Sequence, residues 1–255
     1  MPRQLDFVAL EGLPEIHAGV ALAPLILAAL TRQGLSLRRD DLLVVAQKIV
    51  SKSEGRRFRL RDVRPSTEAI ALAERVQKDA RFVELVLGES TEVIRAVPNI
   101  LITRHRSGHV MANAGIDRSN VPQGSDDGED DWVLLLPQDC DASAASLQAA
   151  LAPASPAVII SDSFGRPWRQ GTVNVALGVA GFAAILDLRG DVDREGRVMQ
   201  TTQIALADAV AAGAGLVMGE AREGRPVVLV RGLDFSAPLR EGRSLLRSLE
   251  EDLFR

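Results

Sequence analysis

The most constraining feature of the sequence is the stretch VIISDSFGRPWRQGTVNVALGVAGF, residues 158–182. Its short apolar opening is typical of a buried strand, which we expect to end where Asp162 and Ser163 follow one another. Arg166 and Arg169 come next, so the end of a buried strand brings together two oxygen-bearing side chains and two cations. We interpret the small residues that follow, residues 172–181, as a packing surface.

Hairpins and helices of mixed order surround this stretch. We expect a strand over residues 41–50, a helix over residues 65–88, and a hairpin around Arg106-Ser107-Gly108. Because no regular β-α-β rhythm appears, the sequence predicts an α+β fold, with mixed sheets and flanking helices, over a doubly wound sheet. We expect one unit over residues 1–255, with two subdomains that arise from a central insert near residues 90–155.

Composition excludes several classes of protein. The formal net charge of −4 and the absence of Tyr argue against a nucleic-acid partner. The longest apolar run near the N-terminus, residues 18–30, is too short to span a bilayer and predicts a buried helix instead, so no membrane partner is expected. The single Cys140 precludes an internal disulfide and is typical of a reducing compartment, so we expect a cytoplasmic protein.

Common nucleotide and metal motifs are absent. There is no P-loop sequence, and GAGLVMG has Met218 where a dinucleotide-binding loop needs its third Gly. DVDREG begins like a calcium loop, but Thr202 replaces the bidentate Glu. The acidic residues 123–131 are interpreted as a solvated linker, and His105 and His109 as a surface pair beside a turn.

Carboxylates at the ends of apolar segments are the strongest chemical signal. Asp117, Asp162 and Glu220 each follow such a segment, and carboxylates from several strand ends can converge on Mg²⁺ or Mn²⁺. Lys48 and Lys52 are an even number of residues apart, so on an extended strand they would share a face. Each residue alone also suits a turn or a sheet edge. Together they favour metal-dependent phosphate chemistry.

Five blocks of the sequence indicate a more specific function than the spacing of charged residues does. They are LLVVAQKIVSKSEGR, ANAGIDRSNV, LLPQDCDASA, the opening stretch above, and DLRGDVDREGRVMQTTQIALADAVAAGAGLVMGEA. In this order they resemble the coenzyme F420-0:L-glutamate ligase (F420 gamma-glutamyl ligase) family, over nearly the whole chain. The resemblance implies a fold specific to this ligase family, with a nucleotide site that is not a P-loop.

The resemblance also implies an activity. Such a protein would use GTP to join L-glutamate to the carboxylate of coenzyme F420-0, would then add further γ-linked glutamates, and would release GDP and phosphate. It would need two divalent ions, Mg²⁺ or Mn²⁺, would be stimulated by K⁺, and would form a homodimer. Some family members carry a C-terminal flavin-binding reductase domain, which we do not expect in this chain.

Residue roles follow from the matched blocks. The positions that match metal ligands of the family are Asp117, Asp162, Ser163 and Glu220. The positions that match nucleotide contacts are Glu11, Gly12, Leu13, Pro14, Gln47, Lys48, Lys52, Asn120, Met218, Gly219, Ala221, Arg222, Glu223, Gly224 and Arg225. Arg166 and Arg169 are expected to hold phosphate or the incoming glutamate, with no further catalytic side chain. Two alternatives stay open: a related amide ligase with another carboxylate acceptor, and a nucleotide-binding regulatory module without turnover.

Overall fold

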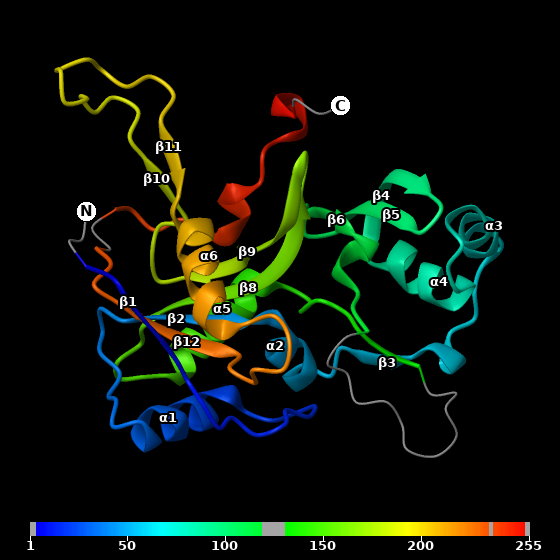
Figure 1. Ribbon diagram of the computed structural model, residues 1–255, viewed down its shortest axis with the longest axis horizontal. Coiled ribbons are helices and arrows are strands. Elements are labelled where there is room, and N and C mark those ends of the chain that lie inside the picture. The colour runs from blue at the N-terminus through cyan, green and yellow to red at the C-terminus, as the bar shows by residue number, and fades with distance from the viewer. Residues whose placement is uncertain (1–3, 119–130, 235–236, 253–255) are drawn as a thin grey trace. The chain divides into compact units, whose positions relative to one another are not determined.

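The computed structural model describes residues 4–118, 131–234 and 237–252 (Figure 1). The chain divides into two compact units. The first, which we call the sheet unit, comprises Met1–Glu15, Ala21–Val50 and Asp139–Arg255. The second, the insert unit, comprises Ile16–Val20 and Ser51–Gln138, whereas the sequence suggested an insert near residues 90–155.

A five-stranded mixed sheet with the order β1-β12-β2-β8-β9 forms the centre of the sheet unit. Its strands are β1 (Asp6–Ala9), β12 (Val227–Arg231), β2 (Leu42–Ala46), β8 (Ala157–Arg166) and β9 (Arg169–Ala180). β2 and β8 run parallel, whereas the other neighbouring pairs are antiparallel. This mixture of strand directions confirms the α+β class.

Helices cover both faces of this sheet (Figure 1). Helix α6 (Leu206–Met218) packs on one face. Helix α5 (Cys140–Ala150) packs on the other so closely that a Cβ atom on Gly178 of β9 would lie 2.1 Å from the Cys140 carbonyl oxygen. Helix α1 (Leu22–Arg32) contacts α5. The small residues of β9 from Ala176 to Ala180 are therefore a packing surface, as the sequence indicated, whereas Thr172 at the start of the run is exposed.

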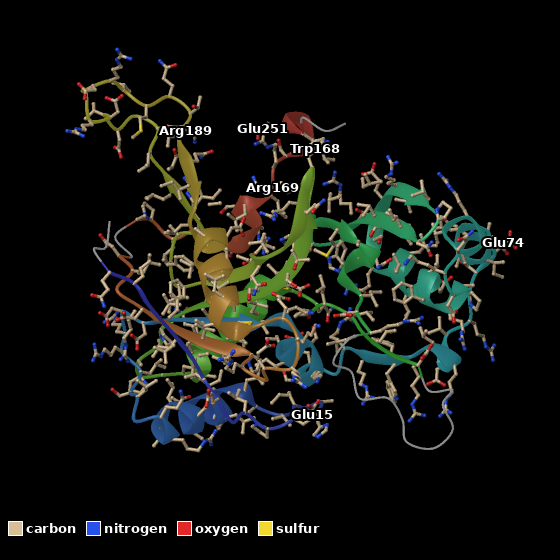
Figure 2. The ribbon with its side chains drawn as sticks, in the orientation of Figure 1. Glu15, Glu74, Trp168, Arg169, Arg189 and Glu251 are labelled. Carbon is tan, nitrogen blue, oxygen red and sulfur yellow. The ribbon has the colours of Figure 1, made fainter. Side chains whose placement is uncertain are left out.

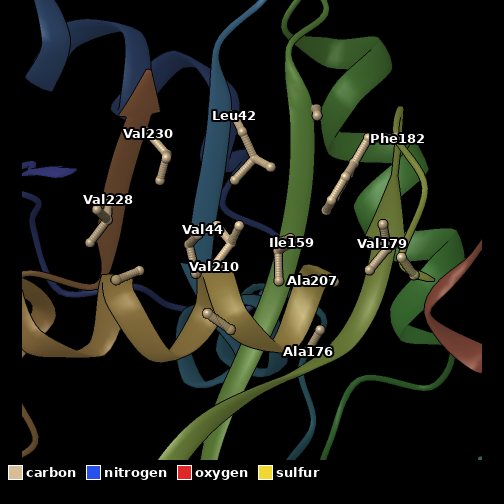
Figure 3. Packing of buried hydrophobic residues seen from close by; sticks show 14 of the residues in the cluster. Leu42, Val44, Ile159, Ala176, Val179, Phe182, Ala207, Val210, Val228 and Val230 are labelled. Atoms are coloured by element: carbon tan, nitrogen blue, oxygen red, sulfur yellow. The ribbon is translucent and has the colours of Figure 1, made fainter. Parts of the chain in front are cut away.

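The core beneath α6 combines large residues of the sheet with small residues of the helix (Figure 3). Leu42, Val44 and Ile159 are fully buried, and each contributes about 1.5–3 kcal/mol relative to an exposed side chain. Ala207, labelled in Figure 3, and Ala211 belong to the same buried cluster, so the helix lies close to the strands. Tight packing at this place fixes where the end of α6, and the loop that follows it, can lie.

Two expectations about secondary structure are wrong. The strand expected to run to Val50 ends at Ala46, and helix α2 (Gln47–Ser53) follows it directly. Lys48 and Lys52 still share a face, but for a different reason, because residues four apart are neighbours on a helix. The strand expected to end at Asp162 and Ser163 instead continues to Arg166, because β9 pairs with β8 along its whole length.

The insert unit contains short helices and two small sheets. Its helices are α3 (Thr67–Val76) and α4 (Ala80–Gly88), capped by Ser66 and Asp79, so the single helix expected over residues 65–88 is broken. The sheets are β3 (Arg57–Arg59) with β7 (Trp132–Leu134), and β4 (Ser90–Val97) with β5 (Ile100–His105) and β6 (Val110–Ala112). β5 and β6 form the expected hairpin.

The histidines of this hairpin differ from the surface pair that the sequence suggested. His105 and His109 are 1% and 7% exposed, and each contacts the hydroxyl of Ser107 through Nδ1. They are buried because the hairpin folds over Glu89, whose carboxylate lies 3.4 Å from Nε2 of His105.

A two-stranded arm and short helical turns complete the sheet unit. The arm consists of β10 (Ile185–Asp187) and β11 (Gln203–Ala205), and the turns lie at Gly242–Leu245 and Leu249–Glu251. Among the helices of the described residues, none has the length and apolarity that crossing a membrane requires.

Candidate functional site

Several predicted segments of the sheet unit begin at the same end of its strands. The amide of Leu10 donates to the carbonyl of Val227 at 2.8 Å, so the Glu11–Pro14 loop starts beside the first residue of β12. The segment Met218–Arg225 leads into that same residue through Pro226. These two predicted nucleotide loops therefore leave the sheet side by side.

The next two strands bring further predicted residues to this end. Ala46 at the end of β2 donates its amide to the carbonyl of Pro226 at 2.8 Å, and Gln47 follows it. Ala46 is also the register partner of Ser161, which precedes Asp162. Because β2 and β8 are parallel, Gln47 and Asp162, which follow this last register pair, lie at the same level of the sheet.

Asp162 and Ser163 lie on opposite faces of the β8–β9 hairpin. Successive side chains of a strand point to opposite faces, and Ser163 pairs with Asn174 whereas Asp162 pairs with Val175. Ser163 faces α6, because its Oγ donates to the Glu220 carboxylate at 2.7 Å. The structure thus brings Ser163 and Glu220 together, whereas Asp162 points to the other face of the strand.

The loop after α6 has a defined turn conformation. Gly219 has a φ of +80°, and a Cβ atom there would lie 2.4 Å from the carboxyl carbon of Glu223. Glu223 accepts a hydrogen bond from the amide of Ala221 at 2.8 Å. Hydrogen bonds from its own amide and from that of Ala221 hold the pKa of Glu223 below its usual value. The loop therefore carries two anionic side chains, Glu220 and Glu223, beside the arginines at 222 and 225.

The Glu11–Pro14 loop is attached to the last turn of α1. Arg32 donates to the Gly12 carbonyl at 2.8 Å, and Gln33 accepts from the amide of Glu11 at 3.0 Å. Gly12 has a φ of +70°, which a residue with a Cβ atom rarely adopts. Sequence reasoning missed Arg32 and Gln33, since nothing near them in the chain marks them as partners of a loop twenty residues earlier.

Arg166 is the last residue of β8 and Arg169 the first of β9, so both lie at the tip of this hairpin. Figure 2 labels Arg169 and the neighbouring Trp168. Arg166 donates to the carbonyl of Gln170 at 3.2 Å, and Arg169 is exposed. Between them Trp168 is 82% exposed and has a φ of +57°. Arg166 comes four positions after Asp162, which corresponds to about 13 Å along the strand. The two cations therefore lie further from Asp162 than the sequence suggested.

Of the remaining predicted site residues, Lys48 lies in the first turn of α2 in the sheet unit, and the others belong to the insert unit or lie outside the described residues. Asp117 exchanges backbone hydrogen bonds with Leu134 at 3.0 and 2.9 Å, and Lys52 lies in the last turn of α2. Asn120 lies outside the described residues.

The residues at the strand ends fit a hard divalent cation by their chemistry. Asp162, Ser163 and Glu220 offer oxygen atoms, which Mg²⁺ and Mn²⁺ prefer. Over residues 4–118, 131–234 and 237–252, no group of three or more His, Cys, Asp or Glu side chains is gathered as a metal cluster. Phosphate oxygens and water commonly complete the shell of Mg²⁺, so one or two carboxylates from the protein suit such an ion.

Comparison with known proteins identifies relatives along nearly the whole chain. The model of the family F420-0:Gamma-glutamyl ligase matches residues 12–232. "Coenzyme F420:L-glutamate ligase" of Methanothermobacter thermautotrophicus is 44% identical over 256 residues, which cover 98% of this chain and 99% of the relative. The proteins of the same name from Natronomonas pharaonis and Methanopyrus kandleri are 43% and 42% identical, over 97% and 90% of this chain and 93% and 91% of their own lengths.

Proposed function

Because this chain belongs to the F420-0:gamma-glutamyl ligase family, we propose that it is a GTP-dependent ligase that adds L-glutamate to coenzyme F420-0 and then adds further γ-linked glutamates. The observation that carries this proposal is the arrangement of the Glu11–Pro14 loop, Gln47, Asp162 and the Met218–Arg225 loop at one end of the main sheet. In the sequence, these four elements are spread over 215 positions, from 11 to 225.

Each group of residues has a distinct role in the proposed site. The two loops and Gln47 bind the nucleotide, and Lys48 and Lys52, on one face of α2, neutralise its phosphates. Asp162, Ser163 and Glu220 would hold divalent ions, which when bound would offset the repulsion between the nucleotide and the acceptor carboxylate. Asp117, in the insert unit, is proposed as a metal ligand because it matches a metal position of the family. Since Asp162 and Ser163 face opposite sides of β8, they serve different ions.

The reaction is best written as two transfers. A carboxylate is a poor electrophile, so the γ-phosphoryl group of GTP first passes to the carboxylate of F420-0, which gives an acyl phosphate and GDP. The amine of L-glutamate then attacks the acyl carbon, the amide bond forms, and phosphate leaves. The residues of this chain contribute by holding the reactants in contact and away from water. No protein nucleophile is required, in keeping with the burial of Cys140 in α5.

A direct assay tests this function and its alternatives. Purified protein is incubated with F420-0, GTP, Mg²⁺ and L-glutamate, and the masses of the products are measured by mass spectrometry. The expected product carries one or more added glutamyl units, with GDP and phosphate released. GDP release without a glutamylated product would indicate an amide ligase with another acceptor. GTP binding without any turnover would indicate a regulatory module.

One substitution tests the ion-binding role within that assay. Asp162→Ala is expected to lower glutamate addition by at least about 100-fold and to leave the fold intact, because the side chain is half-buried on an otherwise paired strand. Asp191→Ala, in the exposed loop between β10 and β11, is the matched control and should retain full activity. Full glutamate addition by Asp162→Ala would remove Asp162 from the proposed site.

A further inference from the structure

The tip of the β8–β9 hairpin presents a large aromatic side chain to solvent. Trp168 is 82% exposed, although Trp is among the side chains that gain most from burial. Its φ of +57° lies in the left-handed region, and in a turn that begins with Pro167 a positive φ at the second position normally belongs to Gly or Asn. Backbone strain of this kind is concentrated at binding and catalytic sites, so Trp168 is a candidate ligand contact.

Arg166, at the start of this turn, has a guanidinium group with one donor left over. β9 contains two extra residues here, because Arg166 pairs with Arg169 whereas Gly165 pairs with Thr172. One of these extra residues is Gln170, whose carbonyl accepts a hydrogen bond from Nη2 of Arg166 at 3.2 Å. Nε of Arg166 is buried and has no hydrogen-bond partner in the part of the chain that the structure describes. A cationic donor in this state suits an anionic oxygen supplied by a ligand.

One face of β8 connects this tip with the candidate ion site. Asp162, Phe164 and Arg166 share that face, because side chains two residues apart in a strand point the same way. All three residues are half-buried, so each has surface that a ligand can contact. The strand therefore presents a carboxylate, an aromatic ring and a cation in a row that ends at Trp168.

The acceptor of the proposed reaction has a matching length and chemistry. F420-0 consists of a planar deazaflavin ring, a ribityl chain, a phosphodiester and the lactyl carboxylate that receives glutamate. About ten single bonds separate this carboxylate from the ring, which corresponds to about 11–12 Å in an extended chain. Asp162 and Arg166 lie about 13 Å apart along the strand. A carboxylate that reacts beside Asp162 therefore places the ring at the hairpin tip, with the phosphodiester between them.

We propose that Trp168 is the platform on which the deazaflavin ring of the acceptor stacks, and that Nε of Arg166 donates to the phosphodiester of the same molecule. This inference rests on the proposed function and deepens it, since it makes the hairpin tip the part of the protein that selects the acceptor. Flat ring systems stack on Trp through dispersion and apolar contact. A hydrogen bond between a guanidinium and a phosphodiester is charge-assisted, and so is stronger than one between neutral groups. Neither residue contributes to the binding of GTP or glutamate.

Equilibrium dialysis of the full chain tests the two contacts separately. All samples contain Mg²⁺ and a non-hydrolysable GTP analogue but no glutamate, so binding is measured without turnover. The ligands are F420-0 and its deazaflavin–ribityl fragment, which lacks the phosphodiester and the lactyl group. Trp168→Gly should weaken the binding of both ligands by about 10-fold or more, whereas Trp168→Phe should keep most of the affinity. Arg166→Met should weaken the binding of F420-0 by about 10-fold and leave that of the fragment unchanged.

Two controls distinguish loss of a ligand contact from loss of structure. Gly adopts a φ of +57° without strain, so the Tm of Trp168→Gly should equal or exceed the wild-type Tm although its affinity falls. Val192 in the loop between β10 and β11 is an apolar side chain that is 62% exposed, and Val192→Ala should leave the affinity for both ligands unchanged.

The possible outcomes separate this proposal from the proposed ligase activity. The stacking platform is overturned if Trp168→Gly binds F420-0 as tightly as wild type, or if it weakens the binding of the GTP analogue instead. It is also overturned if Trp168→Gly has a smaller oligomeric mass in sedimentation equilibrium, which would make the indole a contact between copies of this chain. Equal losses of F420-0 and of the fragment in Arg166→Met would remove the contact with the phosphodiester. If these affinities change as expected but no glutamyl product forms, the ligase activity alone is refuted; a wild-type protein that does not bind F420-0 would refute both.

Discussion

Replacing Glu89 by Gln should destabilise the insert unit. The carboxylate of Glu89 lies 2.7 Å from Nη2 of Arg56 and 3.0 Å from Nη2 of Arg106, and its side chain is 9% exposed. It also lies 3.4 Å from Nε2 of His105. Because Nδ1 of His105 accepts the amide of Ser107 at 3.0 Å, Nε2 is the ring nitrogen that can donate to Glu89.

The magnitude follows from what the Glu89→Gln substitution would leave behind. Loss of one partner of a buried ion pair costs about 3–5 kcal/mol, since the other charge stays buried and uncompensated. Gln keeps the shape and one acceptor oxygen, and Arg106 is 38% exposed and can turn to solvent. We therefore expect a loss of about 2–3 kcal/mol in the free energy of unfolding at pH 7.

The pH dependence provides a second signature. Burial alone would raise the pKa of Glu89, but hydrogen bonds from His105 and Arg56, with the charges of Arg56 and Arg106, outweigh it and lower the pKa below 4.5. A carboxyl with a lowered pKa stabilises the fold above its unfolded pKa and loses that contribution as the pH falls through the folded pKa. The difference between wild type and Glu89→Gln should therefore shrink below about pH 4.

The chain offers a local probe for this experiment. Of its two tryptophans, Trp132 lies in the insert unit and Trp168 in the sheet unit, so in a Trp168→Phe background urea unfolding followed by fluorescence reports the insert unit alone. Glu92→Gln is the matched control, since its contact with Arg104 is 41% exposed on the Glu side and should contribute less than about 1 kcal/mol. A deficit for Glu89→Gln below about 0.5 kcal/mol at pH 7, or one that persists undiminished at pH 3, would contradict this account of Glu89.

Two further substitutions test the sheet unit. Gly178→Ala should lower Tm by at least about 6 °C or prevent folding, because its Cβ would meet the backbone carbonyl of Cys140. Gly88 has open space around it, so the control Gly88→Ala should leave Tm unchanged or slightly higher. Differential scanning calorimetry measures both. Asp41→Asn should lower the free energy of unfolding in urea by about 2–4 kcal/mol, because Asp41 is 1% exposed and accepts two hydrogen bonds from Arg231, at 2.7 and 3.0 Å. An unchanged urea midpoint would mean that the Asp41–Arg231 ion pair contributes little to stability.

Sequence reasoning found the strands of this fold better than their limits. The apolar β-branched segments at 42–46 and 157–160 are strands, because their residues are buried on both faces of the sheet. The polar half of β8 was not predicted, since Asp162 to Arg166 have no apolar period and are held in a strand by pairing with β9. The apolar pattern of a segment indicates whether it is buried, whereas the polar half of β8 is a strand because β9 pairs with it.

The candidate site shows the same division between local and long-range information. The family resemblance, which the comparisons confirm, rests on blocks that can be read directly from the sequence. The hydrogen bonds that place the Glu11–Pro14 loop come from Arg32 and Gln33, whose role depends on how α1 packs. Asn174 was interpreted as part of a packing surface, although it is a lone polar residue between Val173 and Val175. That interruption of an apolar segment was the available signal.

Asn174 also shows why the face of a strand, more than proximity in sequence, decides what residues can do together. Asp162 and Ser163 are adjacent in the chain, yet they face opposite sides of the sheet, whereas Ser163 faces Asn174 and Glu220, which lie 11 and 57 positions away. One ion cannot draw on the side chains of Asp162 and Ser163 equally without distorting β8. If both residues serve the reaction, the site must have one ion on each face of the strand, and exchange of Ser163 for Ala should weaken binding on the α6 face alone. Measuring Mn²⁺ stoichiometry by electron paramagnetic resonance in wild type, Asp162→Ala and Ser163→Ala would decide this, since a single shared ion would be lost in both variants and two ions would be lost one at a time.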